Sequence, residues 1–322
     1  MADSIIFNLN DNDVLIDNII TEVSHNKHAI EKGKVNIQVF QDGESCVNYE
    51  TTMRGKRVFL LTSPNTPLKI MQLMLAIDAA KKSSASEIIP IMPYFPYARQ
   101  DKRDQYRGPI GAKVLAKTLE MLGATSFVTV DLHANQIEGF FDVPLIHIRG
   151  KYLFADFLVK NSNINTVFCS PDAGGVKRVK KIRDLISRRY EGTNIQYVTI
   201  DKTRSGPNQI SEMSIIGNVK DANVIIIDDL CDTGGTLIKA SNALLKAGAR
   251  SVKVLVTHAV MSGSACANIV DSKIKQFICS DTLETEVYEC DMLGKMKVIS
   301  INKEIAMTII GINTNSSVIS AR

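Results

Sequence analysis

One short segment constrains this chain more than any other. Residues 224–236 read Val-Ile-Ile-Ile-Asp-Asp-Leu-Cys-Asp-Thr-Gly-Gly-Thr. The first four residues are β-branched and apolar, and they predict a strand buried on both faces, as in a parallel sheet. Two adjacent carboxylates and a glycine turn follow, and residues 237–247 then have a helical pattern that ends at Gly248. The segment therefore predicts the strand, turn and helix of an α/β fold.

The turn and the carboxylates suit two different parts of one ligand. The glycines allow backbone N–H groups to face an anion, and the helix N-terminus adds the positive end of its dipole, so the turn favours a phosphate. Asp228 and Asp229 instead favour hydroxyl donors or a metal ion. Ribose 5-phosphate has a phosphate at one end and a vicinal diol beside it, and it meets both demands. An ordinary strand–turn–helix with a solvated acidic end is the simpler alternative.

Composition limits the class of protein. The chain has 322 residues, of which 45% are hydrophobic and 22% are charged, and this length suits about two globular domains. It contains no apolar run long enough for a membrane span and no basic-then-apolar leader at its start, so we expect a cytoplasmic protein without a membrane partner. Its six cysteines form no C-x-x-C pair, which favours free thiols. A net charge of +4 is too small to indicate a nucleic-acid partner.

Short β-branched runs alternate with helical patterns along the chain, which is typical of an α/β fold with parallel sheets. The predicted strands are residues 58–61, 88–91, 127–130, 167–169, 195–200, 224–227 and 252–256. The predicted helices are residues 68–82, 110–122 and 237–247. A Gly-Ala pair followed by a strand recurs at residues 123 and 248, which indicates two related halves joined near residue 150.

A second carboxylate-and-glycine turn follows the predicted strand at 167–169. Residues 171–178 read Pro-Asp-Ala-Gly-Gly-Val-Lys-Arg and open a helix. Such a turn suits a pyrophosphate, and Asp172 is available to a magnesium ion that bridges phosphate oxygens. A purely structural turn is the alternative. The same region carries a basic concentration between residues 177 and 189, for which we expect a solvated or anion-attracting surface rather than a nucleic-acid footprint.

Two further segments carry candidate nucleotide contacts. Asp131 and His133 follow the strand at 127–130, and α/β sites lie at the carboxyl ends of strands, so a metal or phosphate role competes with a structural one. Ahead of them, the proline-bounded loop 93–109 carries four basic side chains and pairs Arg99 with Gln100, which suits the phosphates and polar edges of a nucleotide. The chain has no G-x-x-x-x-G-K-[ST] sequence, so any ATP binds without a P-loop.

Six segments in a fixed order carry a resemblance to a known family. They are residues 40–44, 97–101, 131–134, 170–175, 201–204 and 228–236. From about residue 5 to about residue 315 the chain resembles the ribose-phosphate pyrophosphokinases, and most of all their phosphate-activated, ADP-inhibited class I enzymes. The resemblance implies an α/β fold of two similar type I phosphoribosyltransferase-like domains, each a mainly parallel sheet flanked by helices. It places an ATP-side domain at residues 1–150 and a ribose 5-phosphate-side domain at residues 151–322.

The resemblance also implies a role for individual residues, each given by the position in this sequence that matches the family's motif. Magnesium is approached by His133 and Asp172, and the flexible catalytic loop carries Lys202 and Arg204. The ATP-binding positions are Phe40, Asp42, Glu44, Arg99, Gln100, Asp104 and His133, the first three reaching over from a neighbouring subunit. The ribose 5-phosphate positions are Asp228, Asp229, Asp232, Thr233, Gly234, Gly235 and Thr236. The pyrophosphate-side loop is Asp172, Ala173, Gly174 and Gly175.

The implied reaction is a Mg²⁺-dependent transfer of the β,γ-pyrophosphoryl group of ATP to the 1-hydroxyl of ribose 5-phosphate, giving 5-phosphoribosyl 1-pyrophosphate and AMP for nucleotide biosynthesis. A catalytically inactive regulatory subunit of such an enzyme is the alternative. By resemblance we expect a homo-oligomer, a hexamer in the family, with inorganic phosphate and ADP as effectors. Tyr106, Glu138 and the C-terminal residues 317–322 depart from the family's effector site, so we expect weaker control by both effectors.

Overall fold

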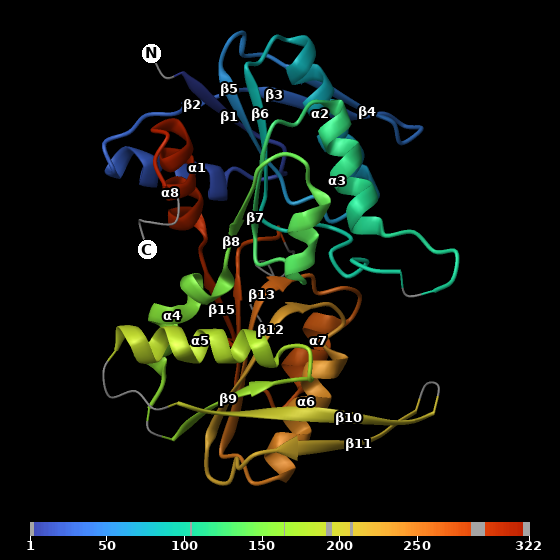
Figure 1. Cartoon of the computed structure of the whole chain (residues 1–322), viewed down its shortest axis with the longest axis vertical. Coiled ribbons are helices and arrows are strands. Elements are labelled where there is room, and N and C mark those ends of the chain that lie inside the picture. The colour runs from blue at the N-terminus through green and yellow to red at the C-terminus, as the bar shows by residue number, and fades with distance from the viewer. Residues whose placement is uncertain are drawn as a thin grey trace. The chain divides into compact units, whose positions relative to one another are not determined.

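The computed structural model describes residues 3–103, 105–163, 165–190, 195–206, 209–284 and 294–317, without the side chains of residues 202–212. The chain separates into two compact units (Figure 1). Unit 1 comprises residues 1–149, 282–284 and 300–322, and unit 2 comprises residues 150–281 and 285–299. The sequence-based division into 1–150 and 151–322 did not anticipate that residues 282–284 and 300–322 cluster with unit 1.

Unit 1 is built on a six-stranded sheet in the order β2-β1-β5-β6-β7-β8. All of its neighbouring strands run parallel. The strands are β1 Ser4–Asn8, β2 Glu31–Lys32, β5 Arg57–Leu61, β6 Glu87–Met92, β7 Phe127–Val130 and β8 Leu145–Ile148. A separate antiparallel ribbon is formed by β3 Val35–Val39 and β4 Ser45–Tyr49. Phe7 packs its ring on Tyr49 of this ribbon, with 4.6 Å between the ring centroids, so the core ties the ribbon to the sheet.

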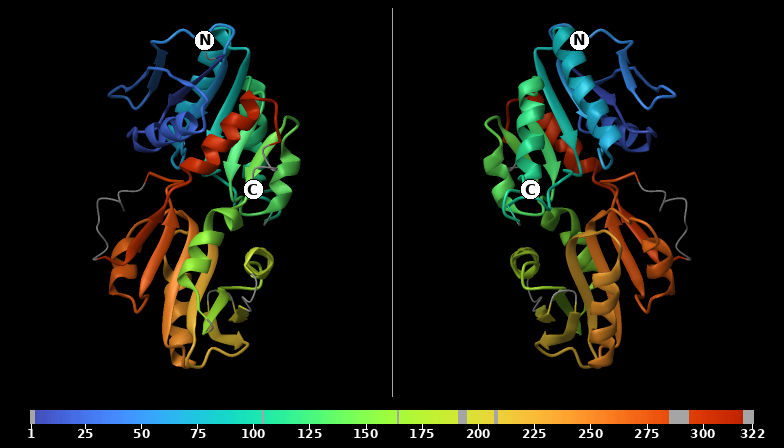
Figure 2. Two further views of the ribbon diagram at one scale, coloured as in Figure 1. Left: turned by 90° about the vertical axis from the view of Figure 1, so that its left-hand side faces the viewer. Right: turned by 90° about the vertical axis from the view of Figure 1, so that its right-hand side faces the viewer.

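Helices cover the sheet of unit 1. They are α1 Val14–His25, α2 Pro67–Lys82, α3 Gly111–Leu122, the 3₁₀ helix η1 Asn135–Phe140 and α8 Asn302–Asn313. The start of helix α2 is capped, because the Thr66 hydroxyl accepts from Lys69 N–H and Pro67 occupies the first turn. Figures 1 and 2 show α1 and α8 side by side, although they come from opposite ends of the chain.

Unit 2 contains a seven-stranded sheet in the order β11-β10-β9-β12-β13-β14-β15. Its pairs run parallel except for β10 with β11, which is antiparallel. The strands are β9 Thr166–Ser170, β10 Gln196–Gly206, β11 Gln209–Ile216, β12 Asn223–Cys231, β13 Ser251–Ala259, β14 Gln276–Ser280 and β15 Met296–Ile299. The helices are α4 Gly150–Asn161, α5 Val176–Arg189, α6 Gly235–Lys246 and α7 Ala265–Asp271.

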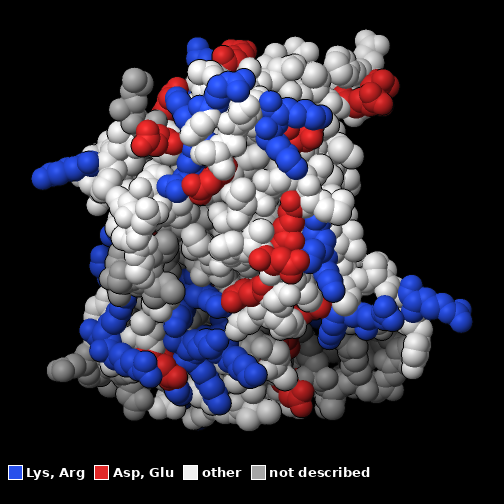
Figure 3. Space-filling view, turned by 45° about the horizontal axis from the view of Figure 1, so that its top comes forward, with Lys and Arg blue, Asp and Glu red and all other residues white. Residues whose placement is uncertain are grey.

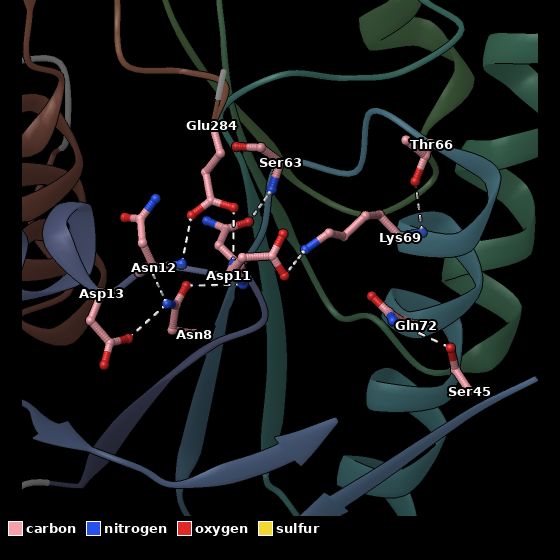
Figure 4. Close-up of polar contacts among 11 residues, drawn as sticks. Asn8, Asp11, Asn12, Asp13, Ser45, Ser63, Thr66, Lys69, Gln72 and Glu284 are labelled. Carbon is pink, nitrogen blue, oxygen red and sulfur yellow. Dashed lines mark hydrogen bonds and ion pairs between the residues drawn. The ribbon is translucent and has the colours of Figure 1, made fainter. Parts of the chain in front are cut away.

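The segment 282–284 returns the chain to unit 1 after β14, and Figure 4 shows how it is held there. The Glu284 carboxylate accepts from two successive backbone N–H groups, those of Asp11 and Asn12, at 2.9 Å each. The Ser63 hydroxyl donates to the Thr282 carbonyl at 2.7 Å. Further along, Arg57 on β5 donates to the carbonyl of Ile312 at 3.0 Å. The end of the chain is therefore an integral part of the first unit.

The predicted elements are confirmed, with differences at their ends. Each of the seven predicted strands and three predicted helices has a counterpart in the structure. Strand β12 continues four residues beyond the predicted end at 227, through both carboxylates to Cys231, because its backbone still pairs with β13 as far as Ala259. Strand β10 likewise extends to Gly206 along β11. Within the described residues, no helix is long and apolar enough to cross a membrane.

Candidate active site

The carboxylates Asp228 and Asp229 lie within β12, in the middle of the unit 2 sheet. Residues 224–227 are buried and hold the strand between β9 and β13, with Ile226 opposite Cys169 of β9. Asp228 lies opposite Val256 of β13 and is partly buried, and Asp229 is only 3% exposed. Since β9 and β12 run parallel, the turns that follow both strands meet at one edge of the sheet.

The turn after β12 is shaped by one glycine. Gly234 has φ +77°, a left-handed conformation that a side chain would strain, and it is the N-cap of α6. No described side chain caps this helix start. The first N–H groups of α6 and the positive end of its dipole thus face the turn formed by Asp232, Thr233 and Gly234. This geometry is suited to an anion such as a phosphate.

The turn after β9 is organised by Asp172. Its carboxylate accepts from Gly175 N–H at 3.0 Å, and its carbonyl accepts from the Ser170 hydroxyl at 2.6 Å. A Cβ atom on Gly175 would lie 2.6 Å from the Ser170 hydroxyl oxygen, so only glycine fits there. Ala173 and Gly174 are exposed on the same turn, just before α5 begins at Val176.

Arg178, in the first turn of α5, contacts both carboxylates of β12. No sequence pattern had marked it as a site residue. Its guanidinium lies 3.4 Å from the Asp228 carboxylate and 3.2 Å from that of Asp229. The sequence placed Arg178 at the end of the segment 171–178 and within the basic concentration of residues 177–189, and it gave this residue no role of its own. The signal that could have distinguished it is its position in the first turn of α5, the helix that follows β9, and β9 is the neighbour of β12. Figure 3 shows one face of the molecule, on which lysine and arginine side chains are spread with acidic side chains among them. Arg178 is paired with carboxylates and partly buried.

Asp228 has the most perturbed electrostatics of this cluster. Burial raises its pKa well above that of an ordinary aspartic acid. The Asp229 carboxylate raises this pKa further, whereas Arg178 lowers it. Asp228 and Asp229 are adjacent, mostly buried and paired with one cation. Such a pair readily retains a proton or accepts hydrogen bonds from hydroxyl groups.

In unit 1, the tip of the β3–β4 ribbon carries three of the predicted ATP-binding residues. Phe40 N–H donates to the Glu44 carbonyl at 2.8 Å, and Glu44 N–H donates to the Asp42 carboxylate at 3.0 Å. Gly43 has φ +89°, which permits the tight turn. The Phe40 ring is 50% exposed, although it is a large apolar side chain. The tip therefore presents an exposed ring with carboxylates beside it.

Arg99 and Gln100 lie in the loop that follows β6. Tyr97 adopts φ +59°, and its carbonyl accepts from Gln100 N–H at 2.8 Å, so the loop turns sharply before Arg99. A Cβ atom on Gly111 would lie 2.5 Å from the Gln100 side-chain oxygen, which shows how closely this side chain packs on the start of α3. The Arg99 side chain is exposed.

The segment after β7 presents His133. Asp131 adopts φ +43°, an uncommon conformation for a residue with a side chain, and the chain then carries the His133 side chain to an exposed position. Asp104 and the side chains of Lys202 and Arg204 lie outside the described residues. The predicted sites thus fall into two described groups, one in each unit.

Comparison with known proteins identifies the family. Residues 4–123 match the model for the N-terminal domain of ribose phosphate pyrophosphokinase, and residues 142–291 match the phosphoribosyl transferase domain. The chain belongs to the ribose-phosphate pyrophosphokinase family. A ribose-phosphate pyrophosphokinase of Halalkalibacterium halodurans is 39% identical over 97% of this chain and 95% of that protein. Another from Porphyromonas gingivalis is 41% identical over 84% of this chain and 83% of that protein.

A solved structure agrees with the ribose-phosphate pyrophosphokinase assignment. The crystal structure of phosphoribosylpyrophosphate synthetase from Mycobacterium smegmatis is 32% identical and superposes with a TM-score of 0.86, covering 97% of this chain and 99% of that one. The expected fold of two phosphoribosyltransferase-like domains is confirmed by these matches. The chain is therefore an enzyme, a pyrophosphokinase of the transferase class.

A pyrophosphokinase of this family raises the question of a metal ion. Among the described side chains, no group of three or more His, Cys, Asp or Glu is arranged to hold one. Magnesium usually binds through one or two carboxylates together with substrate phosphates and waters, not in a cage made by the protein alone. The single carboxylate of Asp172 beside the anion-binding turn fits that mode of binding.

Proposed function

We propose that the enzyme transfers the β,γ-pyrophosphoryl group of ATP to the 1-hydroxyl of ribose 5-phosphate in a magnesium-dependent reaction, giving 5-phosphoribosyl 1-pyrophosphate and AMP for nucleotide biosynthesis. The observation that carries this proposal is the pair Asp228 and Asp229 beside the glycine turn that caps α6. It supplies acceptors for a diol and N–H donors for a phosphate within one turn of chain. Relatives at about 40% identity that are named ribose-phosphate pyrophosphokinase support the same reaction.

The two ends of ribose 5-phosphate would bind to different groups of the protein, the phosphate to backbone N–H groups and the diol to carboxylates. The 5-phosphate would accept from the N–H groups of Thr233 to Thr236 at the start of α6, where the helix dipole favours negative charge. The 2- and 3-hydroxyls would donate to Asp228 and Asp229. Arg178 holds these carboxylates in place and limits their mutual repulsion. This arrangement would leave the 1-hydroxyl directed toward the turn of Asp172 to Gly175.

ATP would be bound by unit 1. The exposed Phe40 ring would stack on adenine, with Asp42 and Glu44 accepting from its ribose or amino group, and Arg99, Gln100, Asp104 and His133 would contact the phosphates and their surroundings. The family resemblance has the ribbon tip reach a neighbouring subunit, so we propose a homo-oligomer of cytoplasmic enzyme. The exposure of Phe40 supports this, because an exposed ring at a ribbon tip is available to a partner.

In the reaction, the 1-oxygen of ribose forms a bond to the β-phosphorus of ATP, the bond from that phosphorus to the α-phosphate oxygen breaks, and AMP leaves with this oxygen. His133 and Asp172 are the residues that would hold magnesium, and the ion, when bound, would supply positive charge that offsets the charge of the transferred group. Lys202 and Arg204 lie on β10, in the part of this strand that pairs with β11, the edge strand of the sheet (Figure 1). Two cations there would stabilise the charge that develops on the β-phosphate and exclude water.

The test is incubation of the protein with ATP, magnesium and ribose 5-phosphate. We expect AMP and 5-phosphoribosyl 1-pyrophosphate in equal amounts, and no AMP without the sugar. Transfer of the γ-phosphate alone would give ADP and would refute the proposed bond cleavage. Absence of product from the pure protein, with activity only after a related subunit is added, would favour the regulatory subunit instead.

Inorganic phosphate and ADP are proposed as effectors, and one reason to expect weak control has changed. An unpaired Glu138 carboxylate in the effector site would repel phosphate through its negative charge. Its carboxylate instead lies 2.7 Å from the Arg149 guanidinium, so much of that charge is compensated within the molecule. Tyr106 is fully exposed and still places a bulky ring in the loop 93–109. The altered C-terminal residues 318–322 lie outside the described part of the chain.

A further inference from the structure

A buried histidine lies directly beneath the segment that presents His133. His147 is on β8, and its side chain is only 4% exposed. Its Nε2 accepts from Leu132 N–H at 2.8 Å, and its Nδ1 lies 2.7 Å from the Glu138 carboxylate. None of the six sequence segments that identify the family includes His147. Its contact falls on the residue immediately before His133.

These two contacts determine which ring nitrogen of His147 carries the proton. A backbone N–H can only donate, so Nε2 must offer its lone pair to Leu132. The proton therefore sits on Nδ1 and is donated to Glu138. Burial also lowers the pKa of His147, although Glu138 opposes this effect. The ring is a neutral bridge from η1, which contains Glu138, to the backbone of the segment after β7.

Arg149 and Asn135 complete the support for Glu138. Arg149 donates through Nη2 to the Glu138 carboxylate at 2.7 Å, and through Nη1 it donates to the Asn135 side chain. The planar guanidinium donates in a fixed direction, so it fixes where the Glu138 carboxylate lies. Glu138 thereby has a fixed position from which to orient the His147 ring.

The backbone segment that His147 contacts contains a bend at Asp131. Asp131 has φ +43°, a conformation that is uncommon for a residue with a side chain. Two consecutive N–H groups fix this bend: Asp131 N–H donates to the Ile148 carbonyl at 2.8 Å, and Leu132 N–H donates to His147. Strand β8 thus fixes the bend through one backbone acceptor and one side-chain acceptor. The direction in which His133 leaves the sheet follows from this bend.

We propose that His147 is a positioning residue for the reaction, which holds Leu132 and so places His133, with Glu138 selecting the tautomer that does this. The proposal rests on the proposed function, since that assigns His133 to the phosphates of ATP and to magnesium. His147 itself contacts no substrate. Its effect passes through one backbone hydrogen bond to the next residue.

The experiment compares three variants in the AMP-release assay. His147→Leu removes the acceptor, whereas His147→Gln retains an oxygen that can accept from Leu132 N–H. Thr125→Val is the matched control, because the Thr125 hydroxyl also accepts from a backbone N–H of unit 1, that of Ile88 at 3.0 Å. We expect His147→Leu to lower kcat/KM for ATP about 10- to 100-fold, as a misplaced contact group does. The KM for ribose 5-phosphate should change less than about twofold, His147→Gln should recover most of the loss, and Thr125→Val should resemble the unaltered enzyme.

A double-mutant cycle separates positioning from general damage. If His147 acts through His133, then His147→Leu should cost little more once His133→Ala is present. Additive losses from the two changes would overturn the proposal. So would a loss in His147→Leu that His147→Gln does not recover, or a loss that affects both substrates equally.

One readout does not depend on the reaction. In protein labelled with ¹⁵N-histidine, the ring-nitrogen shifts should show His147 as the neutral tautomer protonated at Nδ1. In protein labelled with ¹⁵N-leucine, His147→Leu should shift the Leu132 amide signal. If the unaltered enzyme makes no AMP but the tautomer and the amide shift are as expected, the proposed function is refuted. The hydrogen bond between His147 and Leu132 is then still supported. Observation of the Nε2-protonated tautomer would refute the positioning role, whatever the activity.

Discussion

Replacement of Arg178 by methionine should destabilise unit 2 by an amount that depends on pH. The Arg178 side chain is 19% exposed, and it lies within 3.4 Å of Asp228 and 3.2 Å of Asp229. Methionine fills similar space but leaves two adjacent, mostly buried carboxylates without their cation. Removal of one partner from a buried ion pair costs about 3–5 kcal/mol in the free energy of unfolding. That full loss applies only while both carboxylates are ionised.

The direction of the pH dependence follows from Asp228. Its pKa is raised in the folded state, so the folded protein binds a proton that the unfolded chain releases. The free energy of unfolding therefore falls as pH rises from the pKa of an ordinary aspartic acid to the raised folded value. Since Arg178 lowers this folded pKa, its loss extends the window to higher pH. Within the added part of the window, each pH unit contributes about 1.4 kcal/mol to the difference between the two proteins.

The assay is urea unfolding of both proteins at several values between about pH 5 and about pH 8. Circular dichroism is the suitable probe because the chain contains no tryptophan. Hydrogen exchange of a peptide from β12 should assign the loss to unit 2, since two units need not unfold together. Lys181→Met is the control, because it removes one exposed charge from the same helix. A loss that does not change with pH, or one no larger than that of Lys181→Met, would refute the described pairing of Arg178.

Other expectations concern the reaction directly. Lys202→Ala or Arg204→Ala should lower kcat by at least ~100-fold with little change in ATP binding, as for a contact made in the transition state, and a higher KM alone would contradict this role. Asp229→Asn should weaken ribose 5-phosphate binding by roughly 1–3 kcal/mol in calorimetry while ATP binds as before, and equal weakening of both would point to the metal instead. Phe40→Ala should raise the KM for ATP by an equivalent of about 1–3 kcal/mol if the ring stacks on adenine, and an unchanged KM would dismiss that stacking. ADP titrated at saturating ATP over a range of phosphate concentrations should inhibit weakly, because Tyr106 and the C-terminus depart from the family; strong cooperative inhibition would show an intact effector site.

Most of the fold was predicted from local patterns, each of which lies within a short stretch of the sequence. The apolar run 224–227, the glycine at 234 and the helical pattern that follows are local signals, and each has its element in the structure. The continuation of β12 through Asp228 and Asp229 was not predicted, because hydrophobic runs mark a strand only while it stays apolar. Backbone pairing with β13 extends the strand regardless of side-chain polarity.

Features that depend on contacts between distant residues were missed. Arg178 and Asp228 are 50 residues apart in sequence, and their pairing follows from β9 and β12 being neighbours. His147 gave no signal, because the strand that carries it was not among those predicted and its partner is a backbone N–H. The return of α8 to unit 1 depends on α1, whose apolar side can equally be covered by any apolar helix. Tertiary arrangement, not local pattern, decides such pairings.

The Glu284 carboxylate and helix α8 also determine the order in which the chain can fold during synthesis. Unit 1 begins with the first residues to leave the ribosome, yet α8 at residues 302–313 is among the last. At roughly 5–20 residues per second, the stretch from residue 149 to 313 takes on the order of 10–30 seconds to make. During that time the face of α1 that α8 covers stays open to water and to chaperones. Unit 2 contains no residue beyond 299. Its set of segments is therefore complete before that of unit 1, although unit 1 begins first.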